Sequence, residues 1–348
     1  MDKQKTLKRQ FLFCKVINFN KNKEQFVRLI IGAIVIFFIA LIILEPNLCI
    51  SSIYGGLLLW AKTILPSLFP FMFFTKLLTS LDVFDTITKK FEKITKLLFK
   101  APAISSYIFL MSMISGYPMG AKLISEFYQA GKLTEKQANK LTTFCSTSGP
   151  LFIIGSVGTA MFLNKKIGYI LFFSHILSTL LNGIIFRNKF VDYTECKIDE
   201  KDKISLNQIL PETMNSSILS ALIVGGYIAI FFLIIELFSH FGLFNPIIFV
   251  TSKVLSPLGV STETIKSTLF GIIEISKGCL EVSKCNIDIK ISSCIASFLI
   301  SFGGFCTFFQ AITFLSKCKV KYGFYLLQKL TNGILSGIIT FVLASFLL

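Results

Sequence analysis

The chain has 348 residues, of which 53% are hydrophobic and 16% charged, and its formal net charge is +16. A soluble domain is about one quarter charged, so this composition excludes an ordinary soluble enzyme and indicates a membrane protein. The positive charge is mostly Lys in short loops between apolar runs, a pattern that fixes topology against anionic lipid rather than one that binds nucleic acid.

Apolar runs and their interruptions divide the first half of the chain into a series of elements. A basic tail precedes a first span, which is longer than the apolar core of a signal peptide and has no cleavage site after it. A span with two prolines follows, then an amphipathic surface helix, two broken apolar stretches and an ordinary span. In order, these elements are residues 1–26, 27–44, 53–79 with Pro66 and Pro70, 82–100, 104–128, 138–163 and 167–187.

The same order recurs after a polar loop, at residues 191–212. The recurring elements are a span, an amphipathic segment, two broken stretches and a last span, and such a repeat of features indicates an internal duplication. They comprise residues 214–238, 245–258, 262–282 with an interruption at 274–278, 291–316 with an interruption at 301–304, and 322–346.

The stretch 104–128 is predicted to be a re-entrant hairpin, because a straight helix does not place Gly, Pro and Gly at its centre. The stretch 262–282, interrupted at 274–278, takes the same place in the second half and is predicted to be a second hairpin. Each half then crosses the membrane three times, so the second half is inverted relative to the first. The basic loops place the N-terminus in the cytoplasm. We therefore predict an all-α polytopic membrane protein with two inverted repeats, 50–190 and 213–348, each with a re-entrant helical hairpin and a broken transmembrane helix, plus an extra N-terminal helix.

Irregular backbone at membrane depth is tolerated only where it faces protein or a water-filled cavity, so the four breaks are expected to meet at one cavity. The helix ends exposed there offer N–H groups to anions and carbonyl groups to cations. The candidate substrate-binding residues lie at or near these breaks and are Gly116, Tyr117, Pro118, Gly120, Lys122, Ser146, Thr147, Ser148, Gly149, Glu274, Ser276, Lys277, Gly303 and Gln310.

Structural alternatives stay open for several of these residues. Lys122 either contacts substrate or extends to the cytoplasmic headgroups. Glu274 and Lys277 are either a pair that an arriving ion opens or a pair that neutralises itself across one helical turn. The hydroxyls at 146–148 contact substrate or bond to their own helix, and His175 is expected to be a packing histidine. Phosphate-loop, Rossmann, metalloprotease and nucleophile-elbow motifs are missing, so we expect neither an enzyme nor a resident cofactor or metal.

Three strings carry a family resemblance: LPSLFPF at 65–71, SGYPMGAKLI at 115–124 and FCSTSGPLFIIGSVGTAMF at 144–162. They resemble the YlbJ family of bacterial sporulation integral membrane proteins, which carry nucleoside recognition (gate) domains. The resemblance covers most of residues 50–345 and is stronger in the first half. It implies a fold similar to concentrative nucleoside transporters, with two hairpins and two broken helices around the substrate. The second tip lacks the Tyr-Pro pair, which leaves open whether both hairpins touch substrate.

The resemblance further implies movement of dipicolinic acid, a small aromatic dianion, across the outer forespore membrane. Lys122 and Lys277 are compatible with pairing to its carboxylates, and Tyr117 with stacking on its ring. The expected partners are membrane lipid and this small anion, with a homo-oligomer by analogy and no nucleic acid. A nucleoside or other small-solute transporter and a non-transporting scaffold of spore assembly are the alternatives, and the coupling ion, sodium or proton, stays open.

Overall fold

The computed structural model describes residues 25–81, 84–194, 206–256 and 259–348, and every element in these ranges is helical. Nearly all of the predicted tail 1–26 and much of the loop 191–212 lie outside the described residues. The chain divides into two compact units, residues 1–51 and 52–348.

Six helices in the described ranges are long and apolar enough to cross a membrane, which confirms an all-helical integral membrane protein. These helices are Gln25–Leu44, Pro46–Ser80, Lys165–Ile185, Asn207–His240, Ile289–Cys318 and Tyr322–Leu347.

The second candidate span is one continuous helix that contains α2 (Pro46–Leu59), η1 (Trp60–Ile64) and α3 (Leu65–Ser80). The span predicted at 53–79 therefore starts earlier than expected, because the helix already begins at Pro46, whose fixed φ and missing N–H suit a first helical position. Pro66 lies in the first turn of α3 and Pro70 lies inside it. The predicted disruption by the two prolines takes the form of π-helical turns in η1, directly before Pro66.

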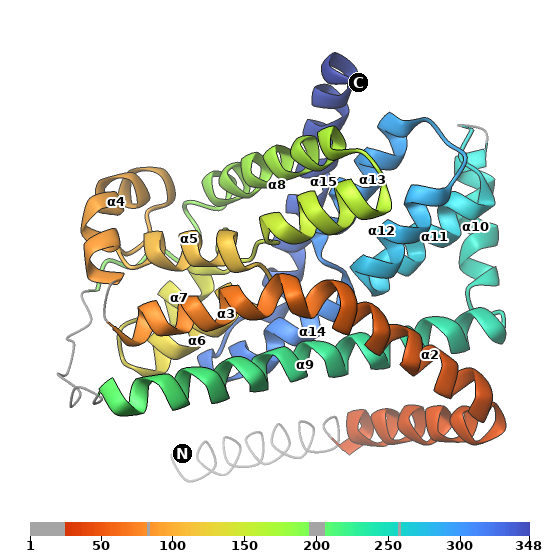
Figure 1. The fold of residues 1–348 in the computed structure, drawn as a ribbon, viewed down its shortest axis with the longest axis horizontal. Helices are drawn as coiled ribbons and strands as arrows, with labels where there is room; N and C mark the ends of the chain where they lie inside the picture. The colour runs from red at the N-terminus through yellow and green to blue at the C-terminus, as the bar shows by residue number, and fades with distance from the viewer. Residues whose placement is uncertain (1–24, 82–83, 195–205, 257–258) are drawn as a thin grey trace, which may run out of the picture. The chain divides into compact units, whose positions relative to one another are not determined.

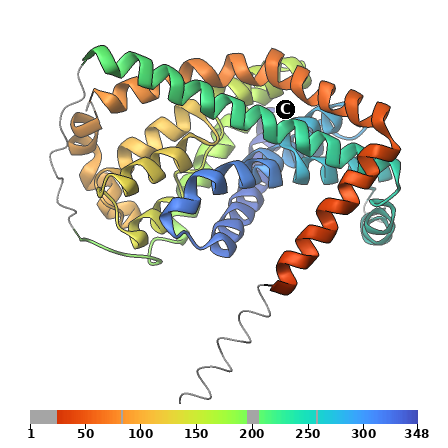
Figure 2. The same cartoon turned by 90° about the horizontal axis from the view of Figure 1, so that it is seen from below.

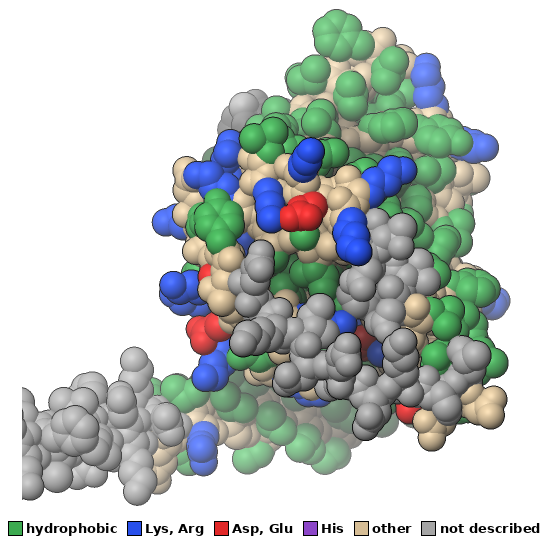
Figure 3. Space-filling model, turned by 90° about the vertical axis from the view of Figure 1, so that its left-hand side faces the viewer, with side chains coloured by type: hydrophobic (Ala, Val, Ile, Leu, Met, Phe, Trp, Pro, Cys, Tyr) green, Lys and Arg blue, Asp and Glu red, His purple; other side chains and the backbone are tan. Residues whose placement is uncertain are grey.

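The predicted amphipathic helix is α4 (Phe84–Phe99). Its last aromatic residue, Phe99, is buried and stacks on Phe144 with ring centroids 4.3 Å apart, while Lys89, Lys93 and Lys96 are exposed. Figure 3 views the side of the molecule where α4 lies and shows many Lys and Arg side chains there, with few acidic ones. Such a helix suits a membrane surface that carries anionic headgroups.

Two pairs of short helices flank the predicted hairpin tips. α5 (Ser105–Ser115) and α6 (Met119–Gln129) are joined by residues 116–118, whereas Glu274 alone separates α11 (Thr262–Ile273) from α12 (Ile275–Lys284). In both pairs the two helices contact each other. The predicted interruption at 274–278 is thus wrong in extent, because the Glu274 side chain caps α12 and lets residues 276–278 stay helical.

The two broken stretches differ in the length of their irregular segment. In the first, residues 142–150 separate α7 (Glu135–Leu141) from the π-helix η2 (Leu151–Met161), so 138–163 contains no long helix. In the second, only Gly303, with φ +86°, separates α13 (Ile289–Phe302) from α14 (Gly304–Leu315), which continues into η4 (Ser316–Cys318).

The remaining helices are α8 (Lys165–Ile185), α9 (Leu206–His240), α10 (Asn245–Leu255) and α15 (Tyr322–Leu347). α9 begins inside the predicted polar loop, because its first turns pack on protein: Ile209 and Thr213 are buried. Figures 1 and 2 both show α9 running beside α3, and these helices are in contact. α15 packs on both α8 and α13.

The contacts between the halves are reciprocal. α6, which follows a break in the first half, packs on α14, which follows a break in the second. α12 packs in turn on η2. The four segments that begin at breaks are therefore paired across the halves of the chain, and this pairing brings the breaks together.

Candidate functional site

A small cavity of about 40 Å³ lies among the breaks, with room for a few water molecules. Apolar side chains from η1, α3, η2 and α9 form part of its wall, including Ile64, Leu68, Phe152 and Ile228. The polar side chains of its wall come from the breaks and from α14, and they are Tyr117, Ser148, Glu274, Ser276, Thr307 and Gln310. A mostly apolar wall with a few convergent polar groups is the usual form of a ligand site.

The first two breaks touch at the level of the backbone. Gly116 has φ +80°, and a Cβ on it would lie 2.6 Å from the backbone N of Gly149. A Cβ on Gly120 would collide with the carbonyl oxygen of Cys145. Only glycine fits such a close approach, so these glycines let α6 meet the segment 142–150.

Tyr117 connects the cavity to a buried lysine. Its hydroxyl lies 3.3 Å from the carbonyl oxygen of Ile300 and 3.4 Å from that of Ser301, near the end of α13. The ammonium of Lys329, on α15, donates to the same hydroxyl and lies 4.1 Å from the centre of the Tyr117 ring. The Lys329 ammonium also lies 3.4 Å from the carbonyl oxygen of Ser146. Lys329 therefore lies directly behind a residue of the cavity wall.

The three hydroxyl residues of the second break bond to other elements and not to their own helix. The Ser146 hydroxyl lies 2.8 Å from that of Tyr325 on α15, and the Thr147 hydroxyl lies 2.8 Å from that of Ser112 on α5. The backbone N–H of Ser148 donates to His175. These contacts hold the segment in place and leave the Ser148 side chain at the cavity wall.

His175 is fully buried on α8 and uses both ring nitrogens. Its Nε2 accepts the Ser148 N–H over 2.9 Å, and its Nδ1 lies 2.7 Å from the Ser301 hydroxyl. Since Nε2 is an acceptor, the neutral ring carries its proton on Nδ1 and donates it to Ser301. His175 is a packing histidine, as expected, but it also fastens the second break to α13.

Glu274 forms the polar centre of the third break. Its side chain is 1% exposed and accepts the backbone N–H groups of Ser276 over 3.1 Å and of Lys277 over 2.8 Å. The Lys277 ammonium turns away from it and forms an ion pair with Glu236 on α9. The ammonium also lies within 5.4 Å of the centres of the Phe232 and Phe270 rings. The expected pair of Glu274 and Lys277 side chains is therefore wrong, because each has another partner.

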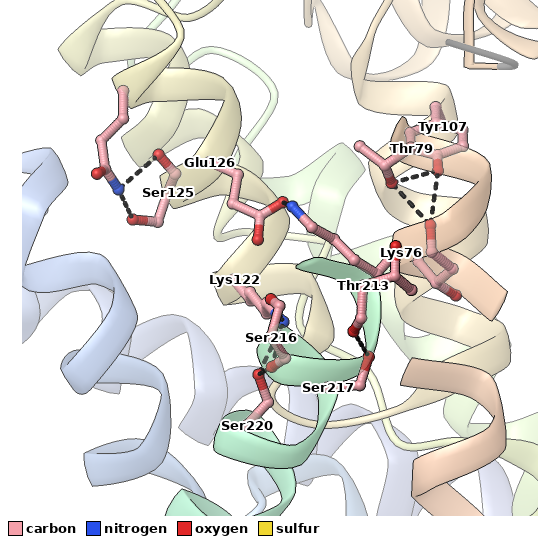
Figure 4. A network of polar contacts seen from close by, with 12 residues as sticks. Lys76, Thr79, Tyr107, Lys122, Ser125, Glu126, Thr213, Ser216, Ser217 and Ser220 are labelled. Carbon is pink, nitrogen blue, oxygen red and sulfur yellow. Dashed lines mark hydrogen bonds and ion pairs between the residues drawn. The ribbon is translucent and has the colours of Figure 1, made fainter. Parts of the chain in front are cut away.

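Lys122 also points to α9. Figure 4 shows its side chain reaching from α6 to Ser216 and Ser220. The ammonium lies 2.8 Å from the Ser216 hydroxyl, 3.2 Å from the Ser216 carbonyl oxygen and 2.7 Å from the Ser220 hydroxyl. One turn later, Glu126 binds Lys76 at 3.0 Å. Lys122 is buried and does not reach the headgroups, and neither it nor Lys277 lines the cavity, in contrast to what their positions in the sequence suggested.

The structure thus divides the predicted site residues into three groups. Lys122 and Lys277 form the group that faces α9. The second group lies in the irregular segments or, for one glycine, in the first turn of the helix that follows, and it comprises Gly116, Pro118, Gly120, Ser146, Thr147 and Gly303. The cavity wall itself contains Tyr117, Ser148, Gly149, Glu274, Ser276 and Gln310.

Sequence reasoning missed Lys329, Thr307 and the apolar wall. Lys329 was overlooked because it stands near the start of the last predicted span, where a lysine usually extends toward water. It lies seven residues inside the helix that begins at Tyr322, about two turns, and that depth was an available signal. Thr307 follows Gly303 by one helical turn, so it points toward the same break. No feature of the sequence marked the apolar residues of the cavity wall, because Ile64 and Ile228 cannot be told apart from the other apolar residues of a membrane span.

The helices that begin at the breaks differ in how their first N–H groups are satisfied. Among the described residues, the first turns of α6, η2 and α14 have no side-chain cap. The first turn of α12 is capped by Glu274. A helix N-terminus carries a partial positive charge and favours anions. Three of the four helices that begin at the breaks therefore carry no fixed anion at their N-terminus, and the fourth holds a carboxylate.

Comparison with known proteins shows two similarities. The Gate family model, described as nucleoside recognition, matches residues 61–166, which include the first two breaks. The chain is 26% identical over 342 residues to the sporulation integral membrane protein YlbJ of Bacillus subtilis (strain 168), and the match covers 92% of this chain and 84% of that protein. No solved structure shows a significant match. The chain is therefore similar to the sporulation protein YlbJ over most of its length, and its residues 61–166 match the nucleoside recognition model.

Proposed function

We propose that this protein is a membrane transporter of a small organic anion, with dipicolinate as the substrate that enters the forespore. The observation that carries the proposal is the cavity at the breaks, into whose surroundings three helices begin without a side-chain cap. Such N-termini stabilise carboxylates without a full counter-charge. The resemblance to the YlbJ family supplies the identity of the anion.

The apolar part of the wall suits an aromatic ring. Leu68, Phe152 and Ile228 offer apolar contacts, while the helix N-termini and the Ser148 hydroxyl suit the carboxylates at the ring edge. Lys122 and Lys277 have partners on α9, so the carboxylates are bound in this proposal by other groups.

Transport is proposed to use two inverted repeats, each with a re-entrant hairpin and a broken helix. The support is the recurring order of elements and the reciprocal packing of α6 on α14 and of α12 on η2. In such transporters the substrate binds near the midplane where the repeats meet. The lysines of α4 favour a cytoplasmic position for this helix, and we place the protein in the outer forespore membrane with its N-terminus in the cytoplasm.

The decisive experiment measures uptake of radiolabelled dipicolinate by proteoliposomes that contain the purified full-length chain. We expect saturable uptake that empty liposomes lack, and uptake no better than that of empty liposomes would contradict the proposal. Runs with and without a sodium gradient, and with and without a proton gradient, identify the coupling ion. In cells, loss of the gene is expected to give spores without dipicolinate, and external dipicolinate is expected to restore it.

A nucleoside is the second candidate, because the matching family is described by nucleoside recognition and because Glu274 and Gln310 are hydrogen-bonding groups of the cavity wall. Radiolabelled uridine in the same proteoliposomes distinguishes the two candidates. A scaffold without transport predicts that neither solute is taken up by these proteoliposomes.

A further inference from the structure

The buried lysines of the protein differ in what satisfies their charge. Lys76 and Lys277 are only partly covered, and each contacts a carboxylate, that of Glu126 and that of Glu236. These two lysines therefore need no further anion, and their positions are explained by packing between helices.

Lys140 is almost completely buried but lies at the end of a helix. Its ammonium donates to the carbonyl oxygens of Phe186, Arg187 and Lys189 over 3.0, 2.6 and 3.1 Å. These carbonyls follow the C-terminus of α8, where the helix dipole favours a positive charge. This lysine is a helix cap and lies outside the cavity wall.

Lys329 has neither kind of compensation. It is 2% exposed in the interior of α15, and its ammonium contacts the Tyr117 hydroxyl and, at 3.4 Å, the Ser146 carbonyl oxygen. No carboxylate of the described residues lies within ion-pair distance of it. An ammonium buried at membrane depth without an anion costs several kcal/mol. An anion that binds in the cavity would explain why the Lys329 ammonium is retained at this buried position.

Tyr117 is the only described residue of the cavity wall that hydrogen-bonds this ammonium. The face of the Tyr117 ring covers the charge, as in a cation–π contact. The Lys122 ammonium is held instead by Ser216 and Ser220, which do not belong to the wall. Tyr117 is therefore the wall residue whose displacement would open Lys329, but not Lys122, to a ligand in the cavity.

We propose that Lys329 is the counter-charge of a substrate carboxylate and that this carboxylate replaces the Tyr117 hydroxyl as its acceptor. The inference rests on the proposed anion transport and names the residue that makes the site select carboxylates. A carboxylate is a stronger acceptor for an ammonium than a phenol, so the exchange is favourable. Glu274, on the opposite half of the chain, places a carboxylate at the other part of the cavity wall. The bound anion is therefore expected to hold its charge at the Tyr117 side.

The test compares thermal unfolding of the purified full-length chain with and without dipicolinate, together with uptake into proteoliposomes. For Lys329→Met we expect an unliganded melting temperature equal to or above that of the wild type, because an uncompensated charge is removed. We also expect at least about tenfold weaker dipicolinate binding and loss of the stabilisation by ligand. Lys140→Met, the matched change of a buried lysine outside the wall, is expected to keep the stabilisation by ligand.

The outcomes separate this inference from the proposed function. Wild type without uptake or stabilisation by dipicolinate overturns the proposed function, whereas active wild type with an equally active Lys329→Met variant overturns only the role of Lys329. If Lys329→Met does not fold, Tyr117→Phe decides. That variant keeps the ring but removes the competing acceptor, so about two- to fivefold tighter dipicolinate binding, a fraction of one hydrogen bond, supports the inference. Unchanged or weaker binding by Tyr117→Phe overturns it.

Discussion

The breaks at 116–118 and at Glu274 occupy equivalent places in the two halves of the chain but are satisfied in different ways. At the first break, three residues leave the helix and the first turn of α6 has no side-chain cap. The Tyr117 side chain extends to α13 and α15. At the second break, a single residue leaves the helix, and its carboxylate caps α12. The polar contacts of the first break are therefore made with other helices, whereas those of the second break are made within its own chain segment.

This difference gives the two sides of the cavity opposite electrostatic character. The first side has an open helix N-terminus and the covered ammonium of Lys329, whereas the second has the fixed carboxylate of Glu274. The recurring order of helices therefore does not imply the same electrostatic character at both breaks. Such an asymmetric cavity fits a ligand with one charged end and one uncharged edge better than it fits a ligand that carries the same charge at both ends.

The largest effect is expected where the first break touches its neighbour. Gly120→Ala places a Cβ on the carbonyl oxygen of Cys145, and neither backbone can yield without displacing a break. We expect a loss of more than about 4 kcal/mol of stability, measured as a low yield of monodisperse protein and a lowered melting temperature.

Gly226→Ala is the control for that change, since a Cβ on this α9 residue meets nothing within 4 Å. Its melting temperature is expected to match or exceed that of the wild type. A stable Gly120→Ala variant would show that α6 does not rest on the second break, and the contrast between the two tips would lose its basis.

The order of the helices was predictable from the sequence, because apolar length and the positions of Gly and Pro depend on local chemistry. The extent of the break at Glu274 was not, because a glutamate that caps a helix looks the same as one that ends it. The partner of Lys277 was also out of reach, since Glu236 lies 41 residues away. Glycine contacts such as that of Gly116 with Gly149 depend on tertiary packing, which a single sequence does not encode locally.

A smaller effect is expected at the second break. Glu274→Gln removes the charge that binds the N–H groups of Ser276 and Lys277. We expect a loss of about 1–2 kcal/mol of stability. Dipicolinate binding is expected to become a few-fold tighter, because a like charge leaves the cavity wall. Thermal unfolding and a binding titration measure the two effects.

Glu281→Gln, on the exposed face of the same helix, is the matched control. Its pair with Lys284 is solvent-accessible, and such pairs contribute about 0–1 kcal/mol. Weaker dipicolinate binding by Glu274→Gln, with Glu281→Gln unchanged, would mean that the carboxylate contributes to binding and that both sides of the cavity attract the ligand.

The smallest effect concerns the polar contacts that close the first half outside the spans. Asp192 accepts the hydroxyl of Thr134 over 2.6 Å, and the hydroxyl and the N–H of Thr194 over 2.6 and 3.0 Å. The hydrogen bonds from Thr134 and Thr194 lower the pKa of the Asp192 carboxyl below its ordinary value. A lowered pKa in the folded state contributes stability above the pKa of the unfolded state, and this stability is lost as the pH falls through the folded value. The contribution is small, because the group is largely exposed.

Asp192→Asn is therefore expected to lower the melting temperature slightly at neutral pH. The difference from the wild type should shrink as the pH falls below about 4, near the ordinary pKa of Asp. Thr194→Val removes one of the hydroxyl donors and is expected to reduce the pH-dependent part without abolishing it, because Thr134 still donates. A difference between wild type and Asp192→Asn that stayed constant from pH 7 to pH 3 would show that the carboxylate charge contributes nothing. This part of the first half would then be held by packing and by uncharged hydrogen bonds, such as those that Gln137 donates to the carbonyl oxygens of Asp192 and Thr194.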